Sequence, residues 1–150
     1  MVKMIKHILV PYDFTEFADV AFEKAIKFAQ KFDANITLLT VIGSEIDTTG
    51  MNYSRAQEAS EKIDDKTKDD LNKIKESQDI DNINVLTNII HNDSKVNGVL
   101  SYAEKNDVDL IIMGSHGRSG FKKLVLGSVA SGVMAKASCP VMVVKPSKHD

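Results

Sequence analysis

The chain has 150 residues, a length typical of one domain, so we predict a single domain over residues 1–150. Its 43% hydrophobic and 27% charged residues are ordinary for a globular protein, and a net charge of −2 gives no reason to expect nucleic acid or an anionic membrane as partner. The single cysteine, Cys139, excludes an internal disulfide and a multi-cysteine metal site, and it favours a reducing cytoplasmic location.

The first third of the chain is predicted to form a strand, a helix and a second strand. Residues 5–12 contain a continuous apolar run, which is typical of a strand buried on both faces, and no small-residue cleavage site follows that would indicate a signal peptide. Asp13 and Glu16 have the spacing of a capping box with Asp13 as N-cap. Apolar residues then recur at helical spacing as far as residues 33–34, and residues 35–42 form the second predicted strand.

The middle of the chain is predicted to contain a long polar helix, a third strand and a shorter helix. Residues 54–77 have a thin apolar stripe and a wide charged face, which indicates a helix exposed along most of its surface. Residues 84–90 form the third predicted strand. Either Asp93 or Ser94 caps the next helix, which the following Asn-Asp pair ends.

The last third is predicted to contain a strand at residues 108–113, a helix at residues 128–137 and a strand at residues 141–144, followed by a polar tail. No apolar run approaches 18 residues, so no membrane-spanning segment is expected. Strands and helices therefore alternate along the whole chain. This pattern predicts an α/β fold with a parallel sheet covered by helices on both faces.

A glycine-rich loop after the fourth predicted strand indicates a phosphate site. Gly114, Gly117 and Gly120 follow the strand, and a helix restarts near Gly127. Loop N–H groups and the unpaired donors of a helix's first turn can converge on one anion, which the helix dipole also favours. The spacing matches neither of the two common glycine fingerprints, which bind dinucleotides and nucleoside triphosphates. The glycines alone are therefore a weak indication of a nucleotide site, and the rest of the chain must support it.

The motif Gly114, two residues, Gly117, nine residues, Gly127 and Ser128 resembles that of the universal stress protein family. The N-terminal segments ILVPYDFTE and ITLLTVI agree with the same family, and the likeness covers nearly the whole chain. The resemblance implies a single-domain, open twisted five-stranded sheet of order 3-2-1-4-5, similar to a Rossmann fold. Because the glycine motif is complete, it also implies the branch of the family that binds ATP.

The resemblance assigns roles to individual residues. Asp13 would accept from the ribose hydroxyls, Val41 would contact adenine, and Gly127 with the two residues after it would donate to the phosphates, which would carry Mg²⁺ or Mn²⁺. Simpler interpretations stay open, because Asp13 could be only a helix cap and Arg118 only a solvated loop residue. The residues expected to bind the nucleotide are Pro11, Tyr12, Asp13, Thr15, Val41, Met113, Gly114, His116, Gly117, Arg118, Gly127, Ser128, Val129 and Ala130.

Three functions remain open from the sequence. The first is an ATP-binding, nucleotide-dependent regulator of the stress response; the second is a slow ATP-hydrolysing enzyme; the third is an interaction module without nucleotide. No catalytic residue and no metal site made of protein ligands is predicted. The last strand, Val141–Val144, would lie at a sheet edge, and the resemblance implies a homodimer that pairs this strand with its copy, unless the tail at residues 146–150 covers it.

Overall fold

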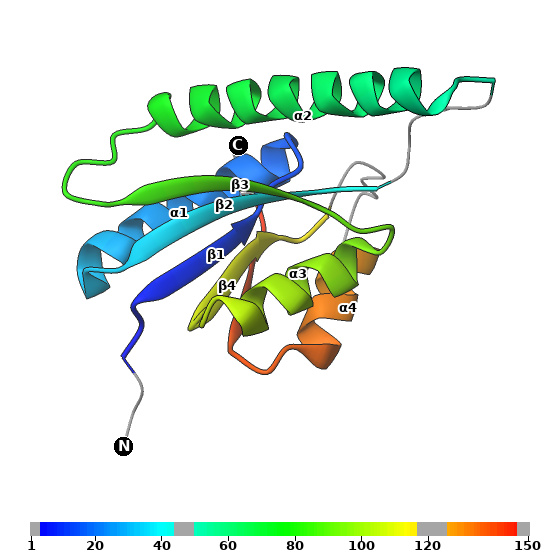
Figure 1. The fold of residues 1–150 in the computed structure, drawn as a ribbon. Coiled ribbons are helices and arrows are strands. Elements are labelled where there is room, and N and C mark those ends of the chain that lie inside the picture. Colours follow the sequence, from blue (N-terminus) through cyan, green and yellow to red (C-terminus); the bar gives the residue numbers. More distant parts are fainter. Residues whose placement is uncertain (1–3, 44–49, 117–125, 147–150) are drawn as a thin grey trace.

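The computed structural model describes residues 4–43, 50–116 and 126–146, in which strands and helices alternate without exception (Figure 1). The elements are β1 (His7–Pro11), α1 (Glu16–Phe32), β2 (Asn35–Ile42), α2 (Tyr53–Glu76), β3 (Val85–His91), α3 (Lys95–Lys105), β4 (Leu110–Gly114), α4 (Ser128–Lys136) and β5 (Val141–Val144).

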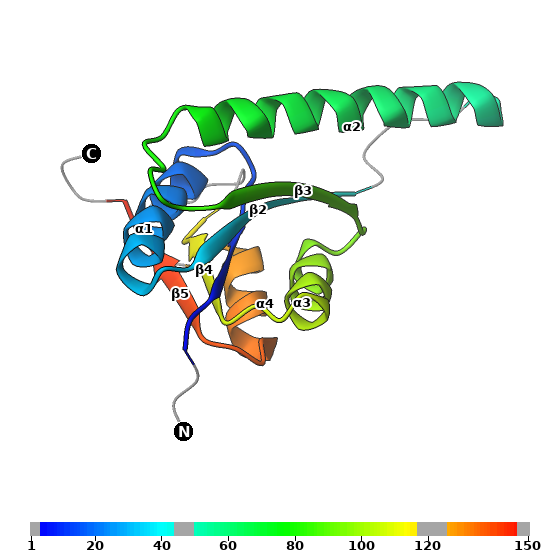
Figure 2. The ribbon, with the colours of Figure 1, turned by 60° about the vertical axis from the view of Figure 1, so that its left-hand side comes forward.

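All five strands form one parallel sheet in the order β3-β2-β1-β4-β5. Helices α1 and α2 cover one face and α3 and α4 the other, as the two views show (Figures 1 and 2). The predicted α/β fold and the predicted strand order are both confirmed. No helix in the described parts of the chain is both long and apolar enough to cross a membrane.

Strand β1 is the centre of the sheet and divides the apolar interior into two layers. Ile8 and Val10 pack in the layer beneath α1, whereas Leu9 packs in the layer beneath α3 and α4, and none of the three is exposed. This alternation follows from the two-residue period of a strand. A continuous apolar run is therefore required here, because both faces of β1 are covered.

Two predicted strands begin later than expected. The first was expected from residue 5 and the fourth from residue 108, but β1 begins at His7 and β4 at Leu110. The carboxylate of Asp109 accepts hydrogen bonds from the backbone N–H groups of Lys6 (2.8 Å) and His7 (3.0 Å). The Asp109 side chain thus replaces the first backbone hydrogen bonds between β1 and β4 and ends their pairing at the amino ends of these strands.

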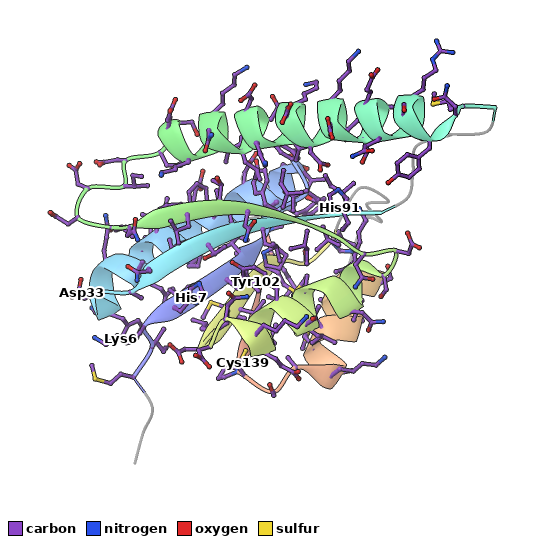
Figure 3. All side chains as sticks on the ribbon, viewed as in Figure 1. Lys6, His7, Asp33, His91, Tyr102 and Cys139 are labelled. Atoms are coloured by element: carbon purple, nitrogen blue, oxygen red, sulfur yellow. The ribbon has the colours of Figure 1, made fainter. Side chains whose placement is uncertain are left out.

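Helix α2 is joined to the rest of the protein by few side chains. Among its described residues only Leu71 is buried, and the outer face carries pairs such as Lys66 and Asp70. At the carboxyl end of β3, His91 lies beneath α2 (Figure 3), and its Nε2 is 2.9 Å from a carboxylate oxygen of Asp64. This contact, the packing of Leu71 and Ile74, and a hydrogen bond from Thr87 to Asn72 hold α2 against the β3 edge of the sheet.

Candidate functional site

A cavity of about 550 Å³ opens at the carboxyl ends of the central strands. After β1 the chain crosses one face to reach β2, and after β3 it crosses the other face to reach β4, so the strand order reverses beside β1. Open parallel sheets bind their ligands at such a reversal. The volume lies within the usual range for a small-molecule site.

The structure brings most of the predicted site residues together around this cavity. Thr15 does not line it, and Gly117 and Arg118 lie outside the described residues. The predicted residues that line the cavity are Pro11, Tyr12, Asp13, Val41, Met113, Gly114, His116, Gly127, Ser128, Val129 and Ala130.

The turn between β1 and α1 corrects the predicted helix cap. The N-cap is Thr15 and not Asp13: the Thr15 hydroxyl accepts from the N–H of Ala18 at 3.3 Å. Asp13 instead accepts from the N–H and the hydroxyl of Thr15, at 3.2 and 2.5 Å. Phe14, between them, adopts φ 65°, a left-handed conformation that shifts the helix start by two residues. Asp13 is therefore left at the cavity wall with its carboxylate anchored by the cap residue.

Tyr12 is a buried residue of the cavity wall, and its hydroxyl remains protonated. Its hydroxyl donates a short hydrogen bond to Asp19, and its ring meets that of Phe14 edge-to-face with centroids 5.0 Å apart. Burial, followed by the hydrogen bond to the Asp19 carboxylate, raises the pKa of Tyr12 far above its usual value. The aromatic contact also supports the left-handed backbone of Phe14.

Strand β2 extends past the end of β1 and presents backbone groups to the cavity. β1 pairs with β2 as far as Pro11 opposite Leu39, and the N–H of Tyr12 donates to the Leu39 carbonyl at 2.7 Å. Backbone groups alternate along a strand, so the N–H and C=O of Val41 point to the same side as those of Leu39. On that side β1 has ended, and Val41 presents one donor and one acceptor to the cavity.

Helix α4 begins at the cavity without a side-chain cap. Its N-cap is Gly127, whereas side chains of Thr15, Asn52 and Ser94 cap the other described helices. The first bond of the helix joins the Ser131 N–H to the Gly127 carbonyl. The N–H groups of the three residues between them lie in the first turn, where an α-helix supplies no partner.

The start of α4 also changes the role expected of the Gly127 N–H group. The N–H of Gly127 donates to the Ser115 carbonyl at 2.7 Å, so it is not free for a phosphate in this structure. The available donors are those of Ser128, Val129 and Ala130. Gly127 has φ −63° and ψ 161°, which any residue can adopt, so the absence of a side chain, and not a special backbone conformation, is what glycine contributes here.

His116 lines the cavity and carries a buried polar atom without a partner among the described residues. Its Nδ1 lies 3.2 Å from the Ser115 hydroxyl, and its ring lies 5.3 Å from that of Phe17. Its Nε2 is buried and has no hydrogen-bond partner among the described residues. A buried polar atom of this kind costs stability until a ligand or water supplies a partner.

Nine residues that line the cavity were not among the predicted site residues: Phe14, Ala18, Leu39, Thr40, Ile42, Ile63, Thr67, Lys95 and Val99. Phe14 is no turn-forming residue type, and nothing in the sequence placed α2 over the cavity. Lys95 carried a usable signal, because Ser94 was a predicted cap and the next residue therefore starts a helix directly after a parallel strand. No group of three or more acidic, histidine or cysteine side chains within the described ranges lies close enough to hold a metal ion.

Comparison with known proteins identifies the family. A family model described as the universal stress protein family matches residues 4–145. Universal stress protein MJ0531 of Methanocaldococcus jannaschii is 30% identical over 148 residues, covering 98% of this chain and 86% of the relative. The solved structure of MJ0577 has a TM-score of 0.83 and 32% identity, with 97% and 99% of the two chains covered. A universal stress protein solved in complex with cAMP has a TM-score of 0.65, covering 97% of this chain and all of its own; at 18% identity it shows the fold alone.

The cap assignment predicts which residue stabilises the start of α1. We expect Thr15→Ala to lower the free energy of unfolding by about 0.5–2 kcal/mol, because the N–H of Ala18 loses its partner. Thr15→Ser keeps the hydroxyl and should stay near wild type. Urea unfolding measures both; an Asp13→Ala variant that is destabilised while Thr15→Ala is not would restore Asp13 as the cap.

Proposed function

Because the chain belongs to the universal stress protein family, we propose that it is an ATP-binding member that acts as a nucleotide-dependent regulator of the stress response. The observation that carries the proposal is the uncapped first turn of α4 at the cavity into which Val41 also presents its backbone. A donor cluster for an anion and a donor–acceptor pair for a base thus share one cavity of suitable volume.

The cavity suggests how ATP would lie. Adenine offers a donor beside ring acceptors, which complements the N–H and C=O of Val41. The carboxylate of Asp13, held by Thr15, would accept from the ribose hydroxyls. The phosphates would extend to the first turn of α4, where the Ser128, Val129 and Ala130 N–H groups would donate, and where Gly127 leaves the approach open. A divalent ion, Mg²⁺ or Mn²⁺, would be held by the phosphates.

His116 adds a polar ring to the cavity wall. Its Nε2 is buried without a partner among the described residues, so a ligand could bond this atom only after the ring turned toward the cavity.

Calorimetric titration of the purified protein with ATP and Mg²⁺ tests the proposal directly. We expect saturable binding with a Kd in the micromolar range or tighter, weaker binding of GTP, and release of bound nucleotide when the protein is denatured. Phosphate release in the same samples separates a binding protein from a slow ATPase. A flat titration, with no nucleotide released on denaturation, would disprove ATP binding.

Ser128→Pro isolates the role of the first-turn donors. Proline is tolerated at the first position of a helix, and Gly127 already has the extended backbone that proline demands of its predecessor. The variant should therefore fold normally but lose one phosphate donor, and we expect its ATP affinity to fall about tenfold. Ser128→Ala removes only the hydroxyl and serves as the control; equal affinity in Ser128→Pro and Ser128→Ala would show that this N–H does not contact the phosphate.

We also propose a homodimer formed through β5. Order β3-β2-β1-β4-β5 places Val141–Val144 at an edge of the sheet. The carbonyl of Pro140 accepts from Ile111 in β4 and that of Val144 from Ser115 just after β4, so the backbone groups of Val141 and Val143 point to the open edge. An apolar edge strand with unpaired groups favours pairing, and pairing about a two-fold axis closes at two subunits.

Val143→Pro tests this interface without disturbing the sheet. The substituted N–H points away from β4, so the internal ladder should survive while the edge loses a donor. We expect light scattering to give twice the 16.5 kDa chain mass for the wild type and the chain mass for the variant. Val143→Ala, which keeps the N–H, should remain dimeric. A wild-type chain that is monomeric at tens of micromolar, roughly where a weak interface is populated, would contradict the proposal.

A further inference from the structure

Lys95, the first residue of α3, lines the same cavity as the first turn of α4. Among the described residues that line the cavity, it is the one lysine or arginine, and Asp13 is the one carboxylate. We propose that Lys95 sets the preference of the site for polyphosphate by placing its ammonium group on the phosphate chain. This inference rests on the proposed nucleotide binding and names the residue that discriminates among nucleotides.

Two close contacts fix the backbone of Lys95 between the base and phosphate ends of the cavity. A Cβ on Gly98 would lie 2.8 Å from a methyl of Val41, and a Cβ on Gly132 would lie 2.7 Å from a methyl of Val96. Helix α3 thus meets β2 at Val41 and meets α4 one turn after its phosphate donors. Both distances are too short for a Cβ, so glycine at these two positions lets α3 pack closely against Val41 and against α4.

The dipole of α3, taken alone, disfavours a cation at Lys95. The N-terminus of a helix carries partial positive charge, and α3 has no acidic residue in its first turn to offset the ammonium. The N-terminus of α4 adds positive potential to the same cavity. A lysine here therefore contributes little to folding through the dipole of its own helix, whereas a polyphosphate between the two helix starts would be attracted by both dipoles and by the ammonium.

Lys95 also takes part in an interaction within the protein, so ligand binding would add to that contact or replace it. Each additional phosphate would add negative charge between the starts of α3 and α4. The ammonium should therefore strengthen the binding of ATP and ADP more than that of AMP, and should leave adenosine unaffected.

Titration of ATP, ADP, AMP and adenosine into wild type and Lys95→Met tests the inference. We expect wild type to prefer ATP and the variant to bind ATP about tenfold or more weakly, as for one charge-assisted contact, with unchanged adenosine affinity. Lys95→Arg should retain most of the preference. Lys66→Met, on the outer face of α2, changes the net charge equally but lies away from the cavity, and should bind like wild type.

The outcomes separate this inference from the proposed function. ATP binding in wild type with equal ATP affinity in Lys95→Met would overturn the role of Lys95 alone. Equal loss of ATP and adenosine affinity would show that Lys95 shapes the cavity and does not read the phosphates, which also overturns it. Absence of any nucleotide binding in wild type would remove both proposals. Thermal unfolding shows whether Lys95→Met is folded at the titration temperature; should it be unfolded, Lys95→Gln replaces it in the same titrations.

Discussion

The complete burial of β1 determines the rest of the architecture. Ile8, Leu9 and Val10 are inaccessible to solvent on both faces, so helices must cover both sides of the sheet. The crossover after β1 covers one face and the crossover before β4 covers the other, and the strand order reverses between them. β1 then ends at Pro11, while β2 continues to Ile42. The cavity occupies the space that a longer central strand would have filled.

The site consists to a large extent of backbone groups, and this explains what the sequence could predict. The alternation of strand and helix patterns was sufficient to predict the α/β fold, the strand order followed from the family resemblance, and the glycine motif placed the start of α4. Hydrogen-bond partners were not predictable, because they depend on local geometry. The left-handed Phe14 moved the cap to Thr15, and the Ser115 carbonyl occupied the Gly127 N–H.

Residues that reach the cavity from other elements were harder to predict for a different reason. Lys95, Ile63 and Thr67 belong to helices on opposite faces of the sheet. Their approach depends on how closely α3 and α2 pack, which the contacts of Gly98 and the length of α2 determine. Sequence periodicity shows which face of a helix is apolar, but it does not show how far a helix projects past the strands.

The weak attachment of α2 has a consequence for the dynamics of the site. One fully buried leucine, the partly buried Ile74, the His91–Asp64 contact and the Thr87–Asn72 hydrogen bond hold a helix of 24 residues, so its opening should require less free energy than unfolding of the sheet. Ile63 and Thr67, however, are part of the cavity wall. A ligand that contacts them favours the closed helix and must be lost, at least in part, when the helix opens. A bound ligand should therefore slow the hydrogen exchange of the α2 amides, and the exchange rate of this helix would report whether the cavity is filled.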